Sequence, residues 1–229
     1  MKRRSKRKIA VSATTALTLA IFIIAFANKL FGDKVRSTLA PAAPDFDKTQ
    51  DFVKIMDVGQ ADAALIYSNG CSAVIDAGLT SSADDISADL KGADIKDIDA
   101  LLITHLHMDH AGALAKIAMS FPIDNLIIPN RDSSAEAMPT VNEAEKRVVA
   151  EKGKVFTATE GMNFNIGEFE VTLLAYFPDA TKENDRSVIT MAKIGNRKFL
   201  FTGDAEKATE AKIRRNIRRE RQYVLPPEQ

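Results

Sequence analysis

The sequence predicts an α/β domain in which helices cover mixed sheets. Two observations lead to this prediction. Short apolar runs rich in β-forming residues follow one another early in the chain, separated by the turn signals Gly59-Gln60 and Asn69-Gly70, and this pattern predicts a strand meander. Farther along, apolar runs alternate with amphipathic segments, which predicts strand–helix–strand units. The domain is therefore expected to combine antiparallel and parallel strand pairing.

The individual elements follow from these patterns in chain order. The expected strands are 52–58, 63–67, 72–76, 99–104, 124–129, 154–157, 162–166, 169–174, 187–194 and 197–202. The expected helices are 81–91, 110–120, 139–152 and a basic helix from about 205 to 220. Pro139 opens the third helix in the first turn, where the missing N–H of proline is not needed.

The N-terminal residues predict export. Residues 2–8 (KRRSKRK) are almost all basic, and Ile9–Ala27 carries no charge and is long enough to cross a bilayer. Because such basic residues stay in the cytoplasm, we expect the rest of the chain outside it, held at the cell membrane or secreted. An uncleaved anchor and a signal cleaved after Ala25-Phe26-Ala27 both stay open. The expected divisions are 1–27 as signal peptide or membrane anchor, 28–50 as linker and 51–229 as the folded domain.

Charge and cysteine content narrow the classes of function. Lys+Arg and Asp+Glu both number 31, so the net charge gives no overall bias toward nucleic acid or membrane. The segment 212–221 (KIRRNIRRER) is locally basic, which leaves an accessory nucleic-acid-binding role open beside a solvated helix face. The single cysteine, Cys71, cannot form an intramolecular disulfide, so the domain must fold without one.

All three histidines of the chain lie in one segment, Thr104–Gly112 (THLHMDHAG). His105 and His107 are two residues apart at the end of an expected strand, so both side chains lie on one face and can bind one cation. Asp109 and His110 follow where the chain turns into a helix, and they can face a second cation. Imidazole and carboxylate ligands suit Zn²⁺, with Mn²⁺ or Fe as alternatives. The segment therefore predicts a metal site.

The histidine segment and four other motifs resemble a known family. HLHMDH has the HxHxDH pattern of metallo-β-lactamase-fold hydrolases. DVGQADA (57–63), VIDAG (74–78), NDRSV (184–188) and FLFTGD (199–204) stand in the order found in the competence-protein (ComEC-like) hydrolase branch. The sequence resembles that branch over residues 52 to about 210. The resemblance implies an αββα sandwich with its metals at one edge of the two sheets.

The resemblance also implies a set of metal ligands. His105 and His107 would serve the first of two divalent ions, Asp109 and His110 would serve the second, and Asp204 would bridge both. Zn²⁺ is the expected metal, with Mn²⁺ or Fe as alternatives. Without the resemblance, the favoured interpretation of Asp204 is the N-cap of the helix expected to begin near residue 205.

Further polar residues receive supporting roles by resemblance. Asn184, Asp185 and Ser187 stand where other members of the fold carry another histidine, and they are expected to contact metal-bound water or substrate. Asn184 and Ser187 are therefore predicted catalytic residues, together with Asp109. Asp57 and Asp76 end two early strands and are expected to orient the imidazoles.

Three departures separate this sequence from the family pattern. Ala61 and Ala113 each replace a glycine, and at a positive φ angle an alanine would cost about 1 kcal/mol. The closing HHGS motif of the branch, which supplies a late histidine ligand, is absent. The chain ends in NIRRERQYVLPPEQ, whose paired prolines cannot lie inside a central strand. We therefore expect the C-terminal strand and helix portion of the fold to be truncated and incomplete.

These observations predict an exported metal-dependent hydrolase. Its expected substrates are phosphodiesters, either small molecules or nucleic acids such as DNA, cleaved through a metal-bridged hydroxide. The alternative is a catalytically degraded remnant that binds metal or an envelope partner without turnover, because the late histidine is absent. Membrane contact is expected through the N-terminal helix, and no specific protein partner is predicted.

Overall fold

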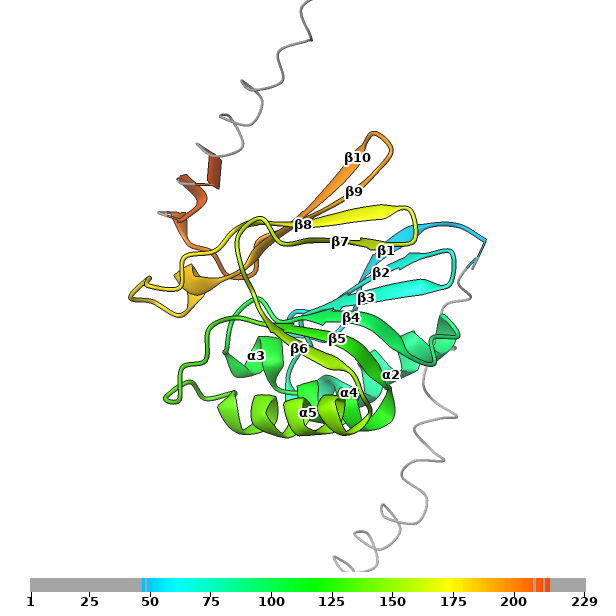
Figure 1. The fold of residues 1–229 in the computed structure, drawn as a ribbon, viewed down its shortest axis with the longest axis horizontal. Coiled ribbons are helices and arrows are strands. Elements are labelled where there is room, and N and C mark those ends of the chain that lie inside the picture. The colour runs from blue at the N-terminus through cyan, green and yellow to red at the C-terminus, as the bar shows by residue number, and fades with distance from the viewer. Residues whose placement is uncertain (1–46, 48, 208, 212, 215–229) are drawn as a thin grey trace, which may run out of the picture. The chain divides into compact units, whose positions relative to one another are not determined.

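Two sheets packed face to face form the centre of the computed structural model (Figure 1). The structure describes residues 47, 49–207, 209–211, 213 and 214. Within this part of the chain, ten strands form one six-stranded and one four-stranded sheet. The predicted α/β layered architecture with a mixed sheet is thereby confirmed.

The elements have the following bounds. The six-stranded sheet has the order β1-β2-β3-β4-β5-β6 and consists of β1 (Phe52–Ile55), β2 (Ala64–Ser68), β3 (Cys71–Ile75), β4 (Ile98–Leu102), β5 (Ile123–Ile128) and β6 (Lys154–Thr157). The four-stranded sheet has the order β10-β9-β8-β7 and consists of β7 (Asn163–Ile166), β8 (Phe169–Ala175), β9 (Ile189–Ile194) and β10 (Arg197–Phe201). The helices are η1 (Thr80–Ser82), α2 (Ala83–Gly92), α3 (Met108–Ala111), α4 (Leu114–Ser120), α5 (Met138–Ala150) and η2 (Asn184–Arg186).

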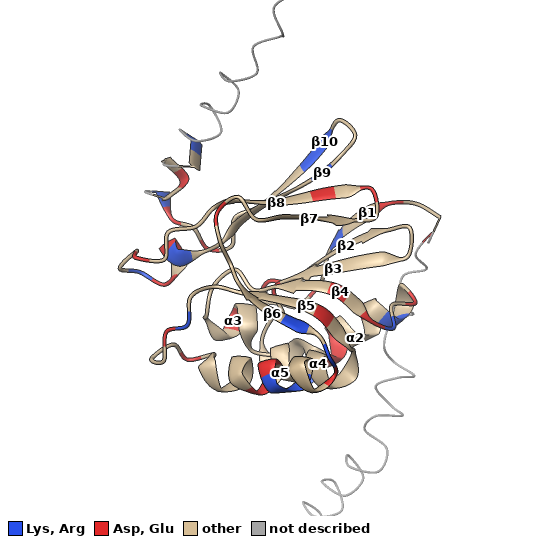
Figure 2. Ribbon diagram, viewed as in Figure 1, with Lys and Arg blue, Asp and Glu red and all other residues tan. Residues whose placement is uncertain are grey.

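The six-stranded sheet joins a meander to a set of parallel strands. β1, β2 and β3 pair antiparallel, whereas β3, β4, β5 and β6 pair parallel. Parallel neighbours need a crossover, and α2, α4 and α5 supply it on one face of the sheet (Figure 1). β2 and β3 carry no charged residue (Figure 2), as expected for strands that are buried on both faces.

Alternation along the strands divides the apolar residues between two cores. In β2, Leu65 packs in the core beneath the helices, and its neighbour Ile66 packs in the core between the sheets. Leu101 and Leu102 divide in the same way in β4. Successive strand side chains point to opposite faces, so each strand of this sheet contributes to both cores. The helical layer contributes buried Ile117 and other apolar residues to the first core.

The described residues form a helical layer, two sheets and part of a second helical layer. The four-stranded sheet covers the face of the six-stranded sheet opposite the helices (Figure 1). On the outer face of the smaller sheet, residues 207, 209–211, 213 and 214 are helical, and Ile213 packs against Ala175 and Ile189. Of the predicted αββα arrangement, the described residues therefore form one helical layer and both sheets. In the second helical layer they contribute one helical segment.

Two elements differ from the sequence prediction near the histidine segment. The helix expected at 110–120 is two helices, α3 and α4, separated by Gly112 and Ala113. A Cβ atom at Gly112 would lie 2.3 Å from the Met108 carbonyl oxygen and 2.8 Å from the Thr80 backbone nitrogen, so only glycine fits this break. The strand expected at 187–194 begins at Ile189, because the preceding residues form the short turn η2.

Several predictions fall on residues that the structure does not describe. The signal or anchor segment 1–27, nearly all of the linker 28–50 and the C-terminal residues 215–229 lie outside the described part of the chain. Among the described residues, no helix combines the length and the apolar character that crossing a membrane requires.

Candidate metal centre

The candidate ligands converge because several strands end at the same edge of the two sheets. Ile55 of β1 pairs with Ala64 of β2, and Ala64 pairs with Ile75 of β3. The parallel strand β4 ends beside β3, and the chain then continues into the histidine segment. Polar residues that follow parallel strands therefore meet at one edge, as is usual for sites on α/β sheets. In the other sheet, β10 ends at Phe201, two residues before Gly203-Asp204.

One group of ligands contains His105, His107 and Asp204. One donor atom from each lies within 4.8 Å of the others. His105 Nε2 and His107 Nδ1 are 3.1 Å apart. Two nitrogens on one tetrahedral zinc would be separated by about 3.3 Å, given the usual Zn–N bond lengths. The donor types and their spacing therefore fit a shared cation.

A second group contains Asp62, His110 and Asp204, again with donor atoms within 4.8 Å of one another. His110 Nε2 lies 3.3 Å from Asp204 Oδ1 and 3.9 Å from Asp109 Oδ2. Asp204 belongs to both groups, as expected for a bridging ligand. Asp109 lies beside His110, with its side chain 42% exposed, and belongs to neither group.

Asp76 orients two of the imidazoles. It is buried at the end of β3, where it accepts hydrogen bonds from the Thr104 backbone N–H and hydroxyl, both at 2.8 Å. His110 Nδ1 lies 2.8 Å from the same carboxylate, so Nδ1 carries the proton and Nε2 faces the other acids. The Thr104 hydroxyl oxygen lies 3.2 Å from His105 Nδ1, which directs Nε2 of that ring to the site. The role expected for Asp76 thus matches its contacts.

The two buried imidazoles have opposite electrostatic environments. Burial lowers the pKa of His105 to about 3, and the neighbouring His110 and His107 reinforce the shift. Burial alone would also lower the pKa of His110, but the hydrogen bond and charge of Asp76, with further acidic neighbours, outweigh it and raise the pKa to about 9. The acidic excess around His110 marks a position where a cation is electrostatically favoured.

The loop that carries the histidines is anchored from two distant segments. Glu183 Oε1 accepts a hydrogen bond of 2.9 Å from the backbone N–H of Leu106. Glu136 Oε1 accepts a hydrogen bond of 2.9 Å from the backbone N–H of Met108. Neither glutamate stands in a motif that suggested a function from the sequence. A side chain that binds a distant backbone N–H does so at no fixed spacing in the chain, so the sequence gives no pattern to recognise.

The NDRS segment joins the metal loop to the end of β10. Ser187 is buried, its Oγ lies 3.4 Å from His105 Nδ1, and it accepts a hydrogen bond of 3.2 Å from the Asp204 N–H. Asp185 instead accepts hydrogen bonds from the Glu206 N–H and the Thr209 hydroxyl, at 3.2 and 2.7 Å, so it caps the helical segment beyond residue 206.

Asn184 presents an unused acceptor near this site. Its Oδ1 atom is buried and has no hydrogen-bond partner among the described residues. Buried polar atoms are nearly always satisfied, so an orphan oxygen in the segment that reaches His105 fits a place for a cation or its bound water. The position of Asn184 is compatible with the role expected for it, which stays a prediction.

Neither alanine that replaces a glycine of the family pattern has a strained backbone. Ala61 is absent from the described non-glycine residues with positive φ angles, and Ala113 has φ −90° and ψ 0°. The cost considered for alanine at these positions therefore does not arise. Gly203 is different, because its φ angle is +49° and a Cβ atom there would lie 2.8 Å from Thr104 Oγ1.

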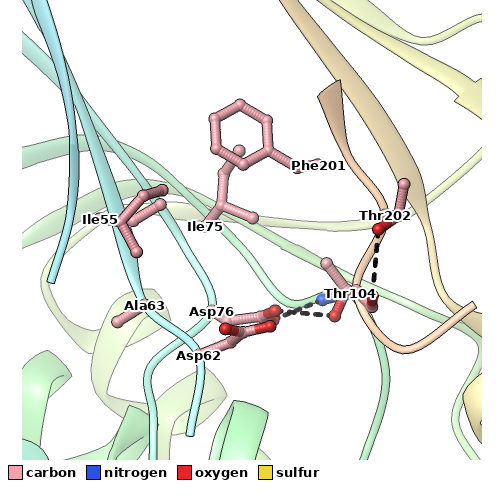
Figure 3. Close-up of a pocket in the computed structure, with 10 residues that line it drawn as sticks. Ile55, Asp62, Ala63, Ile75, Asp76, Thr104, Phe201 and Thr202 are labelled. Carbon is pink, nitrogen blue, oxygen red and sulfur yellow. Dashed lines mark hydrogen bonds between the residues drawn. The ribbon is translucent and has the colours of Figure 1, made fainter. Parts of the chain in front are cut away.

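A small cavity of about 160 Å³ opens beside the ligands (Figure 3). Asp62, Asp76 and Thr104 form its polar side. Ile55, Ile75 and Phe201 form its apolar side, contributed by both sheets. Figure 3 shows the carboxylates of Asp62 and Asp76 next to each other at the base, with the apolar side chains above them.

The DVGQADA motif contributes differently from the sequence prediction. Asp57, which was expected to orient the imidazoles, is exposed. Asp62, five residues later, is the carboxylate that lies beside His110. The motif itself was the available signal for Asp62, but only the sheet register shows which of its two aspartates faces the histidines.

The fold and the centre together define a class of α/β-sandwich proteins with histidine and carboxylate ligands at one sheet edge. The chain belongs to the metallo-beta-lactamase superfamily, whose family model matches residues 56–216. Members of this superfamily are generally hydrolases that use divalent metals, commonly zinc and sometimes iron.

Two relatives connect the chain to competence and recombination proteins. It is 28% identical over 122 residues to ComE operon protein 3 of Bacillus subtilis, which covers 52% of this chain and 15% of the relative. It is 27% identical over 171 residues to Recombination protein 2 of Haemophilus influenzae, which covers 72% of this chain and 20% of the relative. The chain thus spans a fifth or less of either relative. A metallo-beta-lactamase from Cronobacter sakazakii with an HARLDQ motif aligns with a TM-score of 0.48 and 17% identity, over 74% of this chain and 75% of that chain.

Proposed function

We propose that this protein is a metal-dependent phosphodiesterase that works outside the cytoplasm. The observation that carries the proposal is the pair of ligand groups that share Asp204. His105 and His107 would hold one divalent ion, and His110 would hold the other with acidic neighbours. Zn²⁺ suits this mixture of imidazole and carboxylate donors, with Mn²⁺ or Fe as alternatives.

The residues of the chain divide the work around these ions. When bound, two such ions activate water at neutral pH and stabilise charge that develops on the substrate. Asp204 would hold the ions together, and Asp76 keeps His110 oriented through the 2.8 Å contact with Nδ1. Asn184 and Ser187 would line the side reached by the substrate, and Asp109, whose side chain is 42% exposed, would act beside His110.

Phosphodiesters are the substrate class best supported. The supporting facts are the similarity to a competence operon protein and a recombination protein, together with a site built to hold cations that can bind phosphate oxygens. The apolar side of the cavity, with Ile55, Ile75 and Phe201, offers a surface for the organic group of an ester. DNA and small phosphodiesters are both included in the proposal.

The export part of the proposal rests on the N-terminal sequence. Basic residues precede the uncharged segment Ile9–Ala27, which favours a cytoplasmic N-terminus and an exported domain. N-terminal sequencing of protein recovered from the membrane and from the medium distinguishes an intact anchor from a cleaved signal. Recovery of the whole chain from the cytoplasm alone would contradict export.

The test of catalysis uses the purified full chain with bis-p-nitrophenyl phosphate and with single-stranded DNA. We expect hydrolysis that depends on added Zn²⁺ or Mn²⁺ and that His107→Ala abolishes, because the first ion then loses one of its two imidazoles. Asp124→Asn, which changes an exposed carboxylate on β5, is the matched control and is expected to keep full activity.

Two results would contradict the proposal. The first is equal hydrolysis by the parent chain and His107→Ala. The second is the absence of metal-dependent hydrolysis of either substrate. If the chain then still binds metal, the alternative of a metal-binding protein without turnover replaces the proposal.

A further inference from the structure

Asp62 occupies a position in the centre to which no role has been assigned. Its carboxylate lies with His110 and Asp204 in one of the two groups whose donor atoms are within 4.8 Å of one another. Asp62 Oδ2 is 4.0 Å from His110 Nδ1. That nitrogen is already held at 2.8 Å by Asp76, so Asp62 is not the group that orients the ring.

The backbone holds Asp62 in place from both sides. Its N–H donates a hydrogen bond of 3.1 Å to the carbonyl oxygen of Asp109, in the histidine segment. Its own carbonyl oxygen accepts a hydrogen bond of 2.9 Å from the N–H of Gly78, in the VIDAG segment. The peptide units on both sides of the Asp62 side chain are thus tied to the two motifs that carry His110 and Asp76. The carboxylate therefore reaches the centre from a fixed point.

The chemistry of the second group leaves a place for this carboxylate. The chain has three histidines, and two of them lie in the first group, so His110 is the one imidazole available to a second ion. A divalent ion with one imidazole needs further anionic oxygen donors to complete its coordination. The Asp62 side chain is 56% exposed, and its carboxylate lies as far as 4.0 Å from His110 Nδ1. Solvent access leaves its lone pairs available to a metal.

We propose that Asp62 is a ligand of the second metal ion, together with His110 and Asp204. This inference rests on the proposed two-metal function and names a ligand for the ion that has the fewest histidines. Asp62 would thereby supply a donor from the β1–β2 loop, on the side of the centre that faces the cavity (Figure 3). The DVGQADA segment is then a metal-binding loop and not only a structural turn.

The test counts metal ions on the purified full chain. The chain is equilibrated with a small excess of Zn²⁺, separated from free metal and analysed for zinc per chain, and binding is titrated against a chromophoric chelator. We expect two ions for the parent chain. Asp62→Asn should retain one, or bind the second at least about tenfold more weakly. Asp57→Asn, in the same motif but at an exposed position, is the control and should retain both ions.

The outcomes separate this inference from the proposed function. Two ions bound equally well by the parent chain and Asp62→Asn would overturn the role of Asp62 and leave the hydrolase proposal standing. A parent chain that binds one ion would likewise overturn it. A parent chain that binds none would overturn both. Urea unfolding of Asp62→Asn beside the parent chain shows whether the variant is folded, because His105 and His107 are near neighbours in sequence and could hold an ion even in an unfolded chain.

Discussion

At the scale of single residues, Gly203 determines how closely β10 approaches the histidine segment. Its φ angle is +49°, and a Cβ atom there would lie 2.8 Å from Thr104 Oγ1 and 2.9 Å from Ser187 Oγ. Both hydroxyl oxygens lie near His105 Nδ1. Gly203 therefore permits Asp204 to reach the imidazoles without displacing the groups that orient them.

Replacing this glycine should disturb stability and metal binding together. For Gly203→Ala we expect a loss of about 2–4 kcal/mol in the free energy of unfolding, from the positive φ angle and the crowding. Gly195→Ala is the matched control, because Gly195 has φ +51° and no heavy atom within 4 Å of the added Cβ. It should lose only about 1 kcal/mol and keep normal zinc affinity. Urea unfolding and zinc titration measure both effects, and equal losses for the two variants would contradict the role of crowding.

At the scale of elements, the loop between β4 and α3 depends on carboxylates from elsewhere in the fold. Leu106 is buried between two candidate metal-binding histidines, and its backbone N–H donates to Glu183. Glu183 is itself held by Arg186, with an oxygen–nitrogen distance of 3.1 Å. The segment that carries Asn184 and Ser187 therefore also fixes the backbone of the histidine loop.

Removing the anchor should loosen this loop. Glu183→Ala leaves the Leu106 N–H without its acceptor, and we expect a loss of about 1–3 kcal/mol in stability together with weaker zinc binding. Glu183→Gln keeps an acceptor oxygen and should restore most of both properties. Glu136→Ala should cost less, because its partner Met108 lies where water can replace the carboxylate. Denaturant unfolding that is unchanged in Glu183→Ala would refute the anchoring role.

At the scale of the whole molecule, the centre joins parts of the chain that only the fold brings together. Asp62 precedes β2, the histidines follow β4, and Asp204 follows β10 of the other sheet. An unfolded chain keeps the nearby histidines but not the convergence of all three segments. Metal is therefore expected to bind the native state in preference, and binding energy should add to folding energy.

This coupling predicts that zinc raises the thermal unfolding temperature. With free Zn²⁺ at 100 times its dissociation constant, the native state gains about 2.7 kcal/mol. Calorimetry of the full chain with zinc and with a chelator measures the shift. Mg²⁺ prefers all-oxygen sites and should shift the temperature less at the same concentration. His107→Ala should reduce the rise in unfolding temperature that zinc causes. An unfolding temperature that is the same with and without zinc would exclude a metal centre that depends on the fold.

Much of the element order was predictable because alternation and turn residues are local signals. The runs at β2, β3 and β4 were placed to within one or two residues, since strands whose two faces serve two cores are apolar along nearly their whole length. The break between α3 and α4 was not predicted, because it depends on contact of Gly112 with Thr80, 32 residues away. The length of a helix can thus be decided by a neighbour that no local window contains.

The sequence by itself determined the superfamily and most of the candidate centre. Histidines at 105, 107 and 110 beside an aspartate are recognisable because metal ligands on one strand end and one helical turn require fixed short spacings. Only the tertiary structure decided that Asp62, and not Asp57, lies beside His110, and that Glu183 holds the loop. These contacts depend on strand order and register, which bring together segments that carry no common spacing in the chain.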